Sequence, residues 1–249
     1  MKTYGLIGFP LSHSFSKRYF SDKFEKESID GCRYELFPIE HIADLPALLT
    51  SNPDLVGLNV TIPHKVNVFR YLNHVDEAAR EIGAVNCIAI QNSQGTLKLS
   101  GYNTDAFGFE QSLLPLLRAQ HKKALIFGNG GAAKAVKFVL NKLGIDFLSI
   151  VRQPAEGCIT YAEVDAGLLA LHPLLINTTP LGMSPDTHSA PDIPYQAVTP
   201  DHLAYDLVYN PEETLFLSHA AKQGSTVKNG LEMLYLQAEE AWRIWNSIP

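Results

Sequence analysis

The sequence contains few cysteines, no block of basic residues and no long apolar run. Its cysteines, Cys32, Cys87 and Cys158, are odd in number and widely spaced, so they predict neither a disulfide framework nor a CxxC metal pair. This usage is typical of a reducing compartment. The apolar runs are too short for a membrane span, and Pro10 interrupts the N-terminal one before it could form a secretion signal. We therefore expect a cytoplasmic protein with no membrane partner.

The chain also lacks an excess of positive charge. It has 20 Lys and Arg residues against 26 Asp and Glu residues, a formal net charge of −6. Because nucleic-acid binding depends mainly on neutralising phosphates, this balance argues against a nucleic-acid partner. Hydrophobic residues make up 46% of the 249 residues, which is too many for a disordered chain and enough for one large or two modest domains.

Short apolar runs alternate with longer amphipathic ones. Their positions predict strands at 4–9, 56–61, 84–90, 97–99, 124–127, 147–151, 174–177 and 203–208, and helices at 15–27, 66–72, 104–118 and 132–143. Such alternation favours parallel pairing, because a crossover helix is the usual connection between parallel strands. We predict an α/β protein with a domain boundary near residue 103, where the texture of the sequence changes.

A glycine-rich string lies between a predicted strand and a predicted helix. It reads Gly128-Asn129-Gly130-Gly131-Ala132-Ala133. Glycine lets the backbone approach a pyrophosphate, and the N-terminus of the following helix offers free N–H groups to that anion. The spacing matches a dinucleotide fingerprint with alanine in place of the third glycine. A tight turn without a ligand is the alternative interpretation.

The end of the next predicted strand bears on the choice of cofactor. An NAD-binding fold usually places an acidic residue there, whereas this strand ends in Arg152. A carboxylate would repel a 2′-phosphate, but a guanidinium can bind it through paired hydrogen bonds. We therefore predict NADP (NADPH) as the cofactor. An ordinary exposed arginine is the alternative.

Polar strings in the first half of the chain interrupt otherwise apolar sequence. They are Ser12-His13-Ser14-Phe15-Ser16, Asn59-Val60-Thr61-Ile62-Pro63-His64-Lys65, Gly83-Ala84-Val85-Asn86 and Asn103-Thr104-Asp105. Several of them fall at the ends of predicted strands, which is where ligand sites form in open α/β sheets. Side chains collected at such an edge could line a single site.

In their order along the chain, these strings resemble the shikimate dehydrogenase family, as do the glycine-rich string and the strings 177–183 and 230–237. The resemblance implies an N-terminal three-layer α/β substrate domain and a C-terminal Rossmann-type dinucleotide-binding domain, with a cleft between them. It implies a substrate-binding catalytic domain over 1–102 and 231–249 and an NADP-binding domain over 103–230. The implied reaction is the NADPH-dependent reduction of 3-dehydroshikimate to shikimate, in the pathway to chorismate and aromatic amino acids. The implied oligomeric state is a monomer or a homodimer.

The resemblance also implies a role for individual residues. Lys65 and Asp105 match the family's catalytic pair, in which an ammonium neutralises charge that develops on the reacting oxygen. The implied substrate contacts are Ser14, Ser16, Thr61, Asn86, Tyr209 and Gln237. The implied cofactor contacts are Gly128, Asn129, Gly130, Gly131, Ala132, Arg152, Thr178, Met183 and Gly230. Hydroxyl and amide groups suit a substrate with a carboxylate and several hydroxyls, because unmatched polar groups penalise analogues.

The sequence also departs from the family pattern. After Arg152 the crossover helix is shortened or missing, and a second basic residue that the family usually has is absent. His13 and His64 lie beside the matched residues, but without partners at metal-ligand spacing we assign no metal and no catalytic role to them. Two other functions remain open: a broader quinate/shikimate dehydrogenase that uses NAD, and a nucleotide-sensing protein without turnover.

Overall fold

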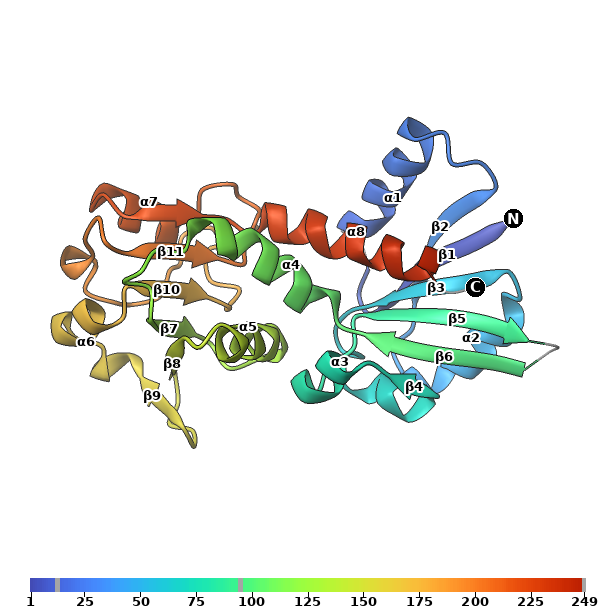
Figure 1. The fold of residues 1–249 in the computed structure, drawn as a ribbon, viewed down its shortest axis with the longest axis horizontal. Coiled ribbons are helices and arrows are strands. Elements are labelled where there is room, and N and C mark those ends of the chain that lie inside the picture. Colours follow the sequence, from blue (N-terminus) through green and yellow to red (C-terminus); the bar gives the residue numbers. More distant parts are fainter. Residues whose placement is uncertain (12–13, 94–95, 248–249) are drawn as a thin grey trace. The chain divides into compact units, whose positions relative to one another are not determined.

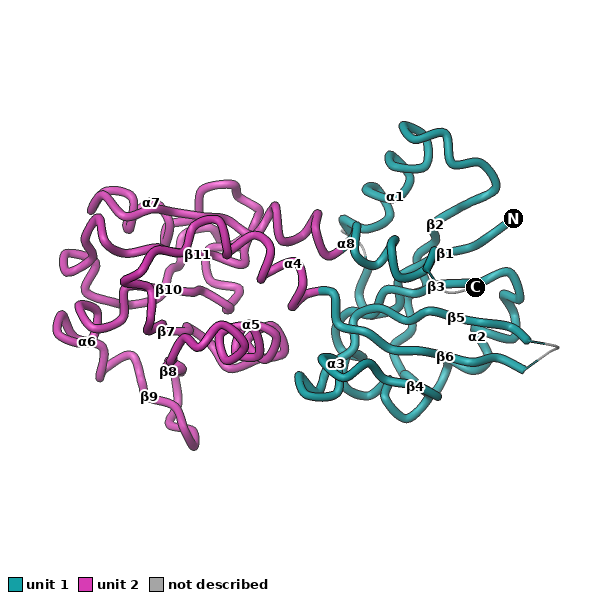
Figure 2. Tube along the Cα trace, viewed as in Figure 1, with its two compact units in different colours: residues 1–104, 238–249 teal, residues 105–237 magenta. Residues whose placement is uncertain are grey.

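In the computed structural model, the chain divides into two compact units (Figure 2). Unit 1 comprises residues 1–104 and 238–249, and unit 2 comprises residues 105–237. The structure describes residues 1–11, 14–93 and 96–247. Each unit has its own sheet and its own hydrophobic clusters.

Unit 1 is a mixed sheet with helices on both faces (Figure 1). Its strands are β1 (Lys2–Gly8), β2 (Cys32–Pro38), β3 (Leu55–Val60), β4 (His74–Val75), β5 (Cys87–Ser93) and β6 (Thr96–Tyr102), in the spatial order β2-β1-β3-β5-β6-β4. Its helical segments are α1 (Phe15–Lys26), η1 (Ile42–Asp44), α2 (Leu45–Ser51), η2 (Asn67–Tyr71), α3 (Glu77–Ile82) and the end of α8 (Leu231–Ser247). β1 pairs in parallel with β2 and β3, whereas β5 is antiparallel to both its neighbours.

Two hydrophobic clusters cover the two faces of this sheet. On one face, aromatic side chains of α1 and α8, among them Phe20 and Trp245, pack against the strands. On the other face, α2 and α3 pack through residues such as Leu45 and Ala79. Gly57 permits the close approach of α8, because a Cβ at this position would lie 2.6 Å from Trp245 Nε1. The result is three layers, as the family resemblance implies.

Unit 2 contains a sheet in which the described strands are all parallel. Its strands are β7 (Lys123–Phe127), β8 (Asp146–Val151), β9 (Cys158–Thr160), β10 (Leu174–Asn177), β11 (Leu203–Asp206) and β12 (Thr226–Lys228). Its helical segments are α4 (Thr104–Leu113), η3 (Leu114–Leu116), α5 (Gly131–Lys142), η4 (Tyr161–Glu163), α6 (Ala166–Leu171), η5 (Tyr195–Ala197), α7 (Leu215–Lys222) and the start of α8.

The strand order of unit 2 is β12-β11-β10-β7-β8-β9. If β7 is counted as strand 1 and β12 as strand 6, the order read from β9 to β12 is 3-2-1-4-5-6, which is the order of the Rossmann fold. The direction of the strand order reverses between β7 and β10. A helix is missing from the described connection between β8 and β9, where residues 152–157 join two parallel strands directly. The predicted fold class and the predicted loss of this crossover helix are therefore confirmed.

Some element boundaries differ from the prediction for identifiable reasons. The helix predicted over 104–118 ends at Leu113, because Pro115 lacks the N–H that would continue it. The strand predicted from residue 84 begins only at Cys87, because Ala84 and Val85 bond to other loops.

The boundaries between the units also lie elsewhere than in the predicted division, which placed them after residues 102 and 230. The first lies after Thr104, because Asn103 and Thr104 bond to residues of unit 1. The second lies after Gln237, because α4 and the start of α8 touch at Gly108. A Cβ at Gly108 would lie 2.5 Å from the carbonyl oxygen of Met233.

Candidate functional site

The polar strings of unit 1 begin at the carboxyl ends of its parallel strands. Thr61 directly follows β3, and its N–H donates to the carbonyl of Ile7 in β1 at 2.9 Å. Gly8 ends β1 beside it, where a Cβ would lie 2.4 Å from the Thr61 methyl group. Glycine is therefore required at this point for the chain segments after β1 and β3 to lie together.

Hydrogen bonds join the string that contains Lys65 to the string that contains Asn86. Val85 N–H donates to the carbonyl of Lys65 at 2.8 Å, and Val60 N–H donates to the carbonyl of Asn86 at 2.8 Å. Asn86 is 3% exposed, and Lys65 is partly exposed. The carbonyl of Lys65 is thus held by Val85, while the residue keeps access to solvent.

The same network extends to the string that ends in Asp105. Asn103 Nδ2 donates to the carbonyl of Ala84 at 2.9 Å. Thr104 N–H donates to Asn86 Oδ1 at 2.7 Å, and Asn86 Nδ2 donates to Thr104 Oγ1 at 3.0 Å. Asp105 comes next, in the first turn of α4. The structure therefore brings together the strings at 59–65, 83–86 and 103–104 within unit 1.

Ser14 and Ser16 lie at the start of α1. Ser14 occupies the N-cap position, yet its side chain caps nothing. Its hydroxyl oxygen is buried and has no hydrogen-bond partner among the described residues. Buried polar groups without partners are rare, so this hydroxyl is a candidate ligand contact. His13, for which the sequence predicts no catalytic role, lies outside the described residues.

His64 is buried under the loop that carries Lys65. Its Nε2 bonds to the carbonyl of Ile39 at 2.8 Å, and its Nδ1 is buried without a partner. Its own carbonyl accepts from the N–H of Val68 in η2. These contacts give His64 a structural function in holding the loop.

In unit 2, the glycine-rich string connects β7 to α5, as predicted. Gly128 has φ 108°, and a Cβ there would lie 2.6 Å from Thr178 Oγ1. The conformation of the loop therefore requires glycine at this position, whether or not a ligand binds. At Gly130 and Gly131, in contrast, a Cβ would meet nothing within 4 Å. Gly130 is the N-cap of α5 and provides no side-chain cap, so the first N–H groups of this helix remain available to an anion. The loop therefore fits a dinucleotide phosphate.

Other predicted cofactor residues lie at the same edge of the sheet. Arg152 directly follows β8 and is exposed. Thr178 follows β10, where its N–H and hydroxyl both donate to the carbonyl of Phe127, at 2.9 and 2.8 Å. Because β7, β8 and β10 are parallel, these residues and Gly128 lie at the carboxyl ends of neighbouring strands. Met183, a few residues beyond Thr178, is 46% exposed.

Asn129 has contacts that the sequence did not predict. Lys137 Nζ donates to its Oδ1 at 2.6 Å, and its Nδ2 lies 3.4 Å from the sulfur of Cys158. A second cation therefore lies beside the phosphate loop. A basic residue in the second turn of α5, after the loop, could have been noticed in the sequence.

The remaining predicted residues of unit 2 lie on α4, on α8 and after β11. Asp105 is one turn before Gly108, and a Cβ at Gly108 would lie 3.1 Å from the backbone nitrogen of Gln237. Gln237 is 8% exposed. Burial raises the pKa of the Tyr209 hydroxyl, which keeps it a neutral donor. A Cβ at Gly230 would lie 2.1 Å from the carbonyl oxygen of Leu207, so packing alone demands glycine here.

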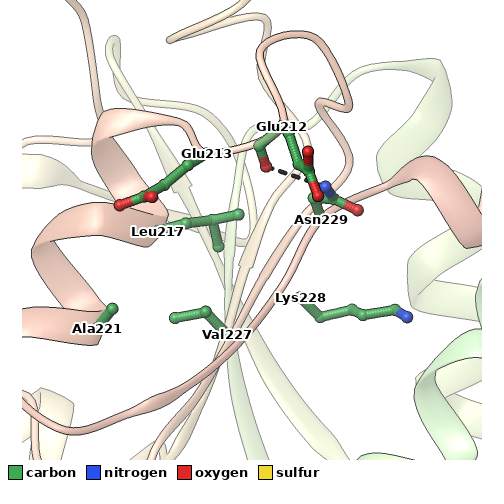
Figure 3. A pocket seen from close by; sticks show the side chains of 7 residues that line it. All are labelled: Glu212, Glu213, Leu217, Ala221, Val227, Lys228 and Asn229. Carbon is green, nitrogen blue, oxygen red and sulfur yellow. Dashed lines mark hydrogen bonds between the residues drawn. The ribbon is translucent and has the colours of Figure 1, made fainter.

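A surface hollow of unit 2 contains none of the predicted site residues (Figure 3). It lies beside α7 and β12 and is lined by Glu212, Glu213, Leu217, Ala221, Val227, Lys228 and Asn229. Asn229 Nδ2 donates to the carbonyl of Glu212 at 2.9 Å across one side of it. The hollow is open and flanked by two carboxylates, which disfavours an anionic ligand.

The described residues contain no group of three or more His, Cys, Asp or Glu side chains that could hold a metal ion. Within 1–11, 14–93 and 96–247, every helix is too short or too polar to cross a bilayer.

A Rossmann-type unit with an open phosphate loop, joined to a unit with a polar network around a lysine, defines a nucleotide-dependent α/β dehydrogenase class. Residues 6–88 match the family described as shikimate dehydrogenase substrate binding domain. The NADP(+) shikimate dehydrogenase of Desulforamulus reducens is 36% identical, over 97% of this chain and 88% of its own length. The chain belongs to the shikimate dehydrogenase family.

Solved structures agree with this assignment. The shikimate dehydrogenase of Thermus thermophilus, solved with NADP(H) and shikimate, has a TM-score of 0.85 and 30% identity, over 100% of this chain and 94% of that one. The quinate dehydrogenase of Corynebacterium glutamicum, solved with NAD, has a TM-score of 0.86 and 26% identity, over 99% and 94%. The family predicted from the sequence is confirmed.

Proposed function

We propose that this chain is an NADP-dependent shikimate dehydrogenase, an oxidoreductase that reduces 3-dehydroshikimate to shikimate. The observation that carries the proposal is the hydrogen-bonded network that fixes Lys65, Asn86 and Thr104 relative to one another in unit 1. The similarity to NADP(+) shikimate dehydrogenases along nearly the whole chain supports the same reaction and cofactor.

In the proposed mechanism, unit 1 binds the substrate. The hydroxyls of Ser14 and Ser16 donate to the substrate carboxylate without adding charge. Thr61 and Asn86 provide donors and acceptors for its hydroxyls. Tyr209 and Gln237, in unit 2, receive a substrate-binding role from the family resemblance. A matched set of this kind selects the substrate because each unmatched polar group costs roughly 1–3 kcal/mol.

Lys65 and Asp105 form the proposed catalytic pair. The Lys65 ammonium stabilises the negative charge that develops on the carbonyl oxygen during reduction, and it donates the proton that completes the hydroxyl group. Asp105 orients the ammonium and accepts from a substrate hydroxyl. In the reverse direction Lys65 takes the same proton.

Unit 2 holds the proposed cofactor site. The backbone N–H groups of 128–132 and the N-terminus of α5 bind the pyrophosphate. Arg152 binds the 2′-phosphate, and Thr178, Met183 and Gly230 line the nicotinamide side. When bound, NADPH supplies the hydride. The open space above Gly130 and Gly131 fits this assignment.

The test is an assay of shikimate-dependent NADP reduction with the wild type and Lys65→Ala. We expect an active wild type and a kcat for the variant lowered by about 10²–10⁴-fold, the usual contribution of general acid–base catalysis. Lys98→Ala, at an exposed lysine of unit 1, is the control for lost charge and is expected to keep wild-type rates. A wild type inactive with both nicotinamides would favour a sensor, and equal rates with quinate and NAD would favour the broader dehydrogenase.

The proposed surroundings follow from the same assignment. All three cysteines are free thiols, which suits a reducing cytoplasm. Small-molecule substrate and cofactor are the proposed partners, with no nucleic-acid or membrane partner. The proposed state is a monomer or a homodimer, which sedimentation of the purified protein would distinguish.

A further inference from the structure

Lys137 of α5 reaches the part of the unit 2 sheet where the crossover helix is missing. Residues 152–157 join β8 to β9 and contain no helix, although all of them are described. Phe147 and Ser149 of β8 face the same side of the sheet, because residues two apart on a strand do so. Cys158 of β9 faces this side too, since it lies opposite Ser149 in the parallel register. The ammonium of Lys137 lies on this side, 5.9 Å from the centre of the Phe147 ring.

The side chain of Asn129 crosses β8 on the same side. Asn129 belongs to the glycine-rich string that follows β7, and its Nδ2 donates to the sulfur of Cys158 in β9 at 3.4 Å. Because β8 lies between β7 and β9 in the sheet, this contact spans β8. Lys137 Nζ in turn donates to Asn129 Oδ1 at 2.6 Å. The ammonium of Lys137 is therefore held beside the carboxyl-terminal half of β8.

The end of β8 is where the Rossmann fold places the 2′ position of the adenosine ribose. Gly128 N–H donates to the carbonyl of Ile150 at 2.8 Å, so the glycine-rich string starts beside the last residues of this strand. Arg152, which is proposed to bind the 2′-phosphate, directly follows the strand and is exposed. Two cations from different elements, Arg152 and Lys137, thus come to the end of one strand.

The chemistry of the 2′-phosphate suits two cations better than one. A phosphate monoester carries roughly 1.5 to 2 negative charges near pH 7 and presents three acceptor oxygens. NAD has a neutral hydroxyl at the same position of the ribose. A cation at the end of β8 therefore strengthens the binding of NADP and contributes little to the binding of NAD.

The contacts of Lys137 leave its positive charge available to an anion. Its hydrogen-bond partner is a neutral amide, and within the described chain no carboxylate forms an ion pair with it. Lys142 of the same helix, in contrast, bonds to Glu110 at 2.8 Å. An ammonium has three donors, and Asn129 accepts from one of them. The contact with the Phe147 ring is a structural alternative, but it would affect NADP and NAD alike.

We propose that Lys137, held by Asn129, is a second cation for the 2′-phosphate of NADP and determines, together with Arg152, the preference for NADP over NAD. This role rests on the NADP site of the proposed function. It adds to that site a side chain from the second turn of α5.

The test is calorimetric titration of the wild type and Lys137→Met with NADP, NAD and adenosine 2′,5′-bisphosphate, without substrate. Methionine keeps the apolar length of the side chain and removes the charge. We expect Kd to rise about tenfold for NADP and for the bisphosphate, which corresponds to one lost charge-assisted hydrogen bond. Kd for NAD is expected to change less than about twofold, because NAD lacks the 2′-phosphate.

Lys123→Met is the matched control. Lys123 is an exposed lysine at the first residue of β7, at the opposite end of the sheet from the glycine-rich string. Its variant is expected to leave all three Kd values unchanged, so an effect of net charge is separated from a local one. The double variant Lys137→Met, Arg152→Ala is expected to bind NADP no more tightly than NAD. If Lys137→Met does not fold, Lys137→Gln is expected to show the same pattern.

The outcomes separate this role from the proposed function. A wild type that binds NADP, with unchanged Kd values in Lys137→Met, overturns the role of Lys137 alone. Equal weakening of NADP and NAD also overturns it, since Lys137 would then hold the glycine-rich string and not the 2′-phosphate. A wild type that binds neither NADP nor the bisphosphate overturns the proposed cofactor site, and the role of Lys137 with it.

Discussion

Asn177 and Asp206 face each other at the carboxyl ends of β10 and β11, and Asn177 Nδ2 donates to Asp206 Oδ1 at 2.9 Å. Asp206 is fully buried, and it also accepts from Val208 N–H at 3.0 Å and from the Thr214 hydroxyl at 2.6 Å. Despite these donors, burial raises the pKa of its carboxyl from 3.8 to about 6. The buried carboxyl of Asp206 thus holds the end of β10, which Thr178 directly follows.

This raised pKa gives stability a defined dependence on pH. Below its ordinary pKa of 3.8, the Asp206 carboxyl is protonated in both the folded and unfolded states. Above about pH 6 it is ionised in both, and the folded state then bears the cost of a buried charge, about 3 kcal/mol for a shift of this size. This contribution to stability is therefore lost as the pH rises from the unfolded-state pKa to the folded-state pKa.

Asp206→Asn removes that dependence. The free energy of unfolding of the wild type minus that of the variant is expected to fall by about 2.4 kcal/mol from about pH 4 to about pH 7. Urea unfolding followed by circular dichroism measures it, with Asp146→Asn, at an exposed aspartate of the same unit, as the control. A difference that stays constant or rises with pH would show that the carboxyl does not carry this penalty.

Arg152 is predicted to decide between NADP and NAD. Arg152→Ala is expected to raise KM for NADP by about 10–100-fold, which corresponds to a lost charge-assisted hydrogen bond, and to leave KM for NAD nearly unchanged. Initial rates at varied cofactor concentration measure both constants. Arg118→Ala removes the same charge from another exposed position of unit 2 and serves as the control. An unchanged preference for NADP in Arg152→Ala would contradict the assignment of Arg152 to the 2′-phosphate.

The strongly patterned parts of the fold could be predicted from the sequence. The runs that became β7, α5, β8 and β10 were predicted to within about one residue at each end, because apolar strands and an amphipathic helix carry clear periodicity. β2 was not predicted, because the strands were predicted from continuous apolar runs, whereas this edge strand alternates Arg33 and Glu35 with apolar residues. β9 and β12 are three-residue strands that have no pattern of their own.

The candidate site could be predicted in its strings but not in its connections. Residues such as Lys65 and Asn86 stand in recognisable motifs, so their types and order were visible. Asp206 acquires its importance from a tertiary contact, its register with Asn177. Periodicity within one segment contains no information on such partners.

The glycine-rich loop offers a test that separates a cofactor cradle from a tight turn. Gly130→Ala adds a methyl group into open space, so stability is expected to change by less than about 0.5 kcal/mol. If the loop contacts the pyrophosphate, the methyl group obstructs it, and KM for NADP is expected to rise about tenfold or more. Steady-state kinetics and thermal unfolding of the same sample measure both.

Gly128→Ala is the contrasting variant. Its φ of 108° and the nearby Thr178 Oγ1 make any side chain unfavourable, so a loss of stability of about 1–2 kcal/mol or more is expected. A Gly130→Ala protein with both normal stability and normal KM for NADP would support the interpretation of a turn without a ligand.

Ser14 provides the sharpest separation of function from stability. Its buried hydroxyl has no partner among the described residues, so the folded protein gains nothing from it and bears its desolvation. Ser14→Ala is expected to leave the free energy of unfolding unchanged or to raise it by up to about 1 kcal/mol, and to raise KM for shikimate about tenfold. Urea unfolding and steady-state kinetics measure the two effects. Thr50→Ala, at an exposed hydroxyl that bonds to the carbonyl of Pro46, is the control in which KM should not change. A destabilised Ser14→Ala protein with normal KM would mean that this serine serves the fold and not the substrate.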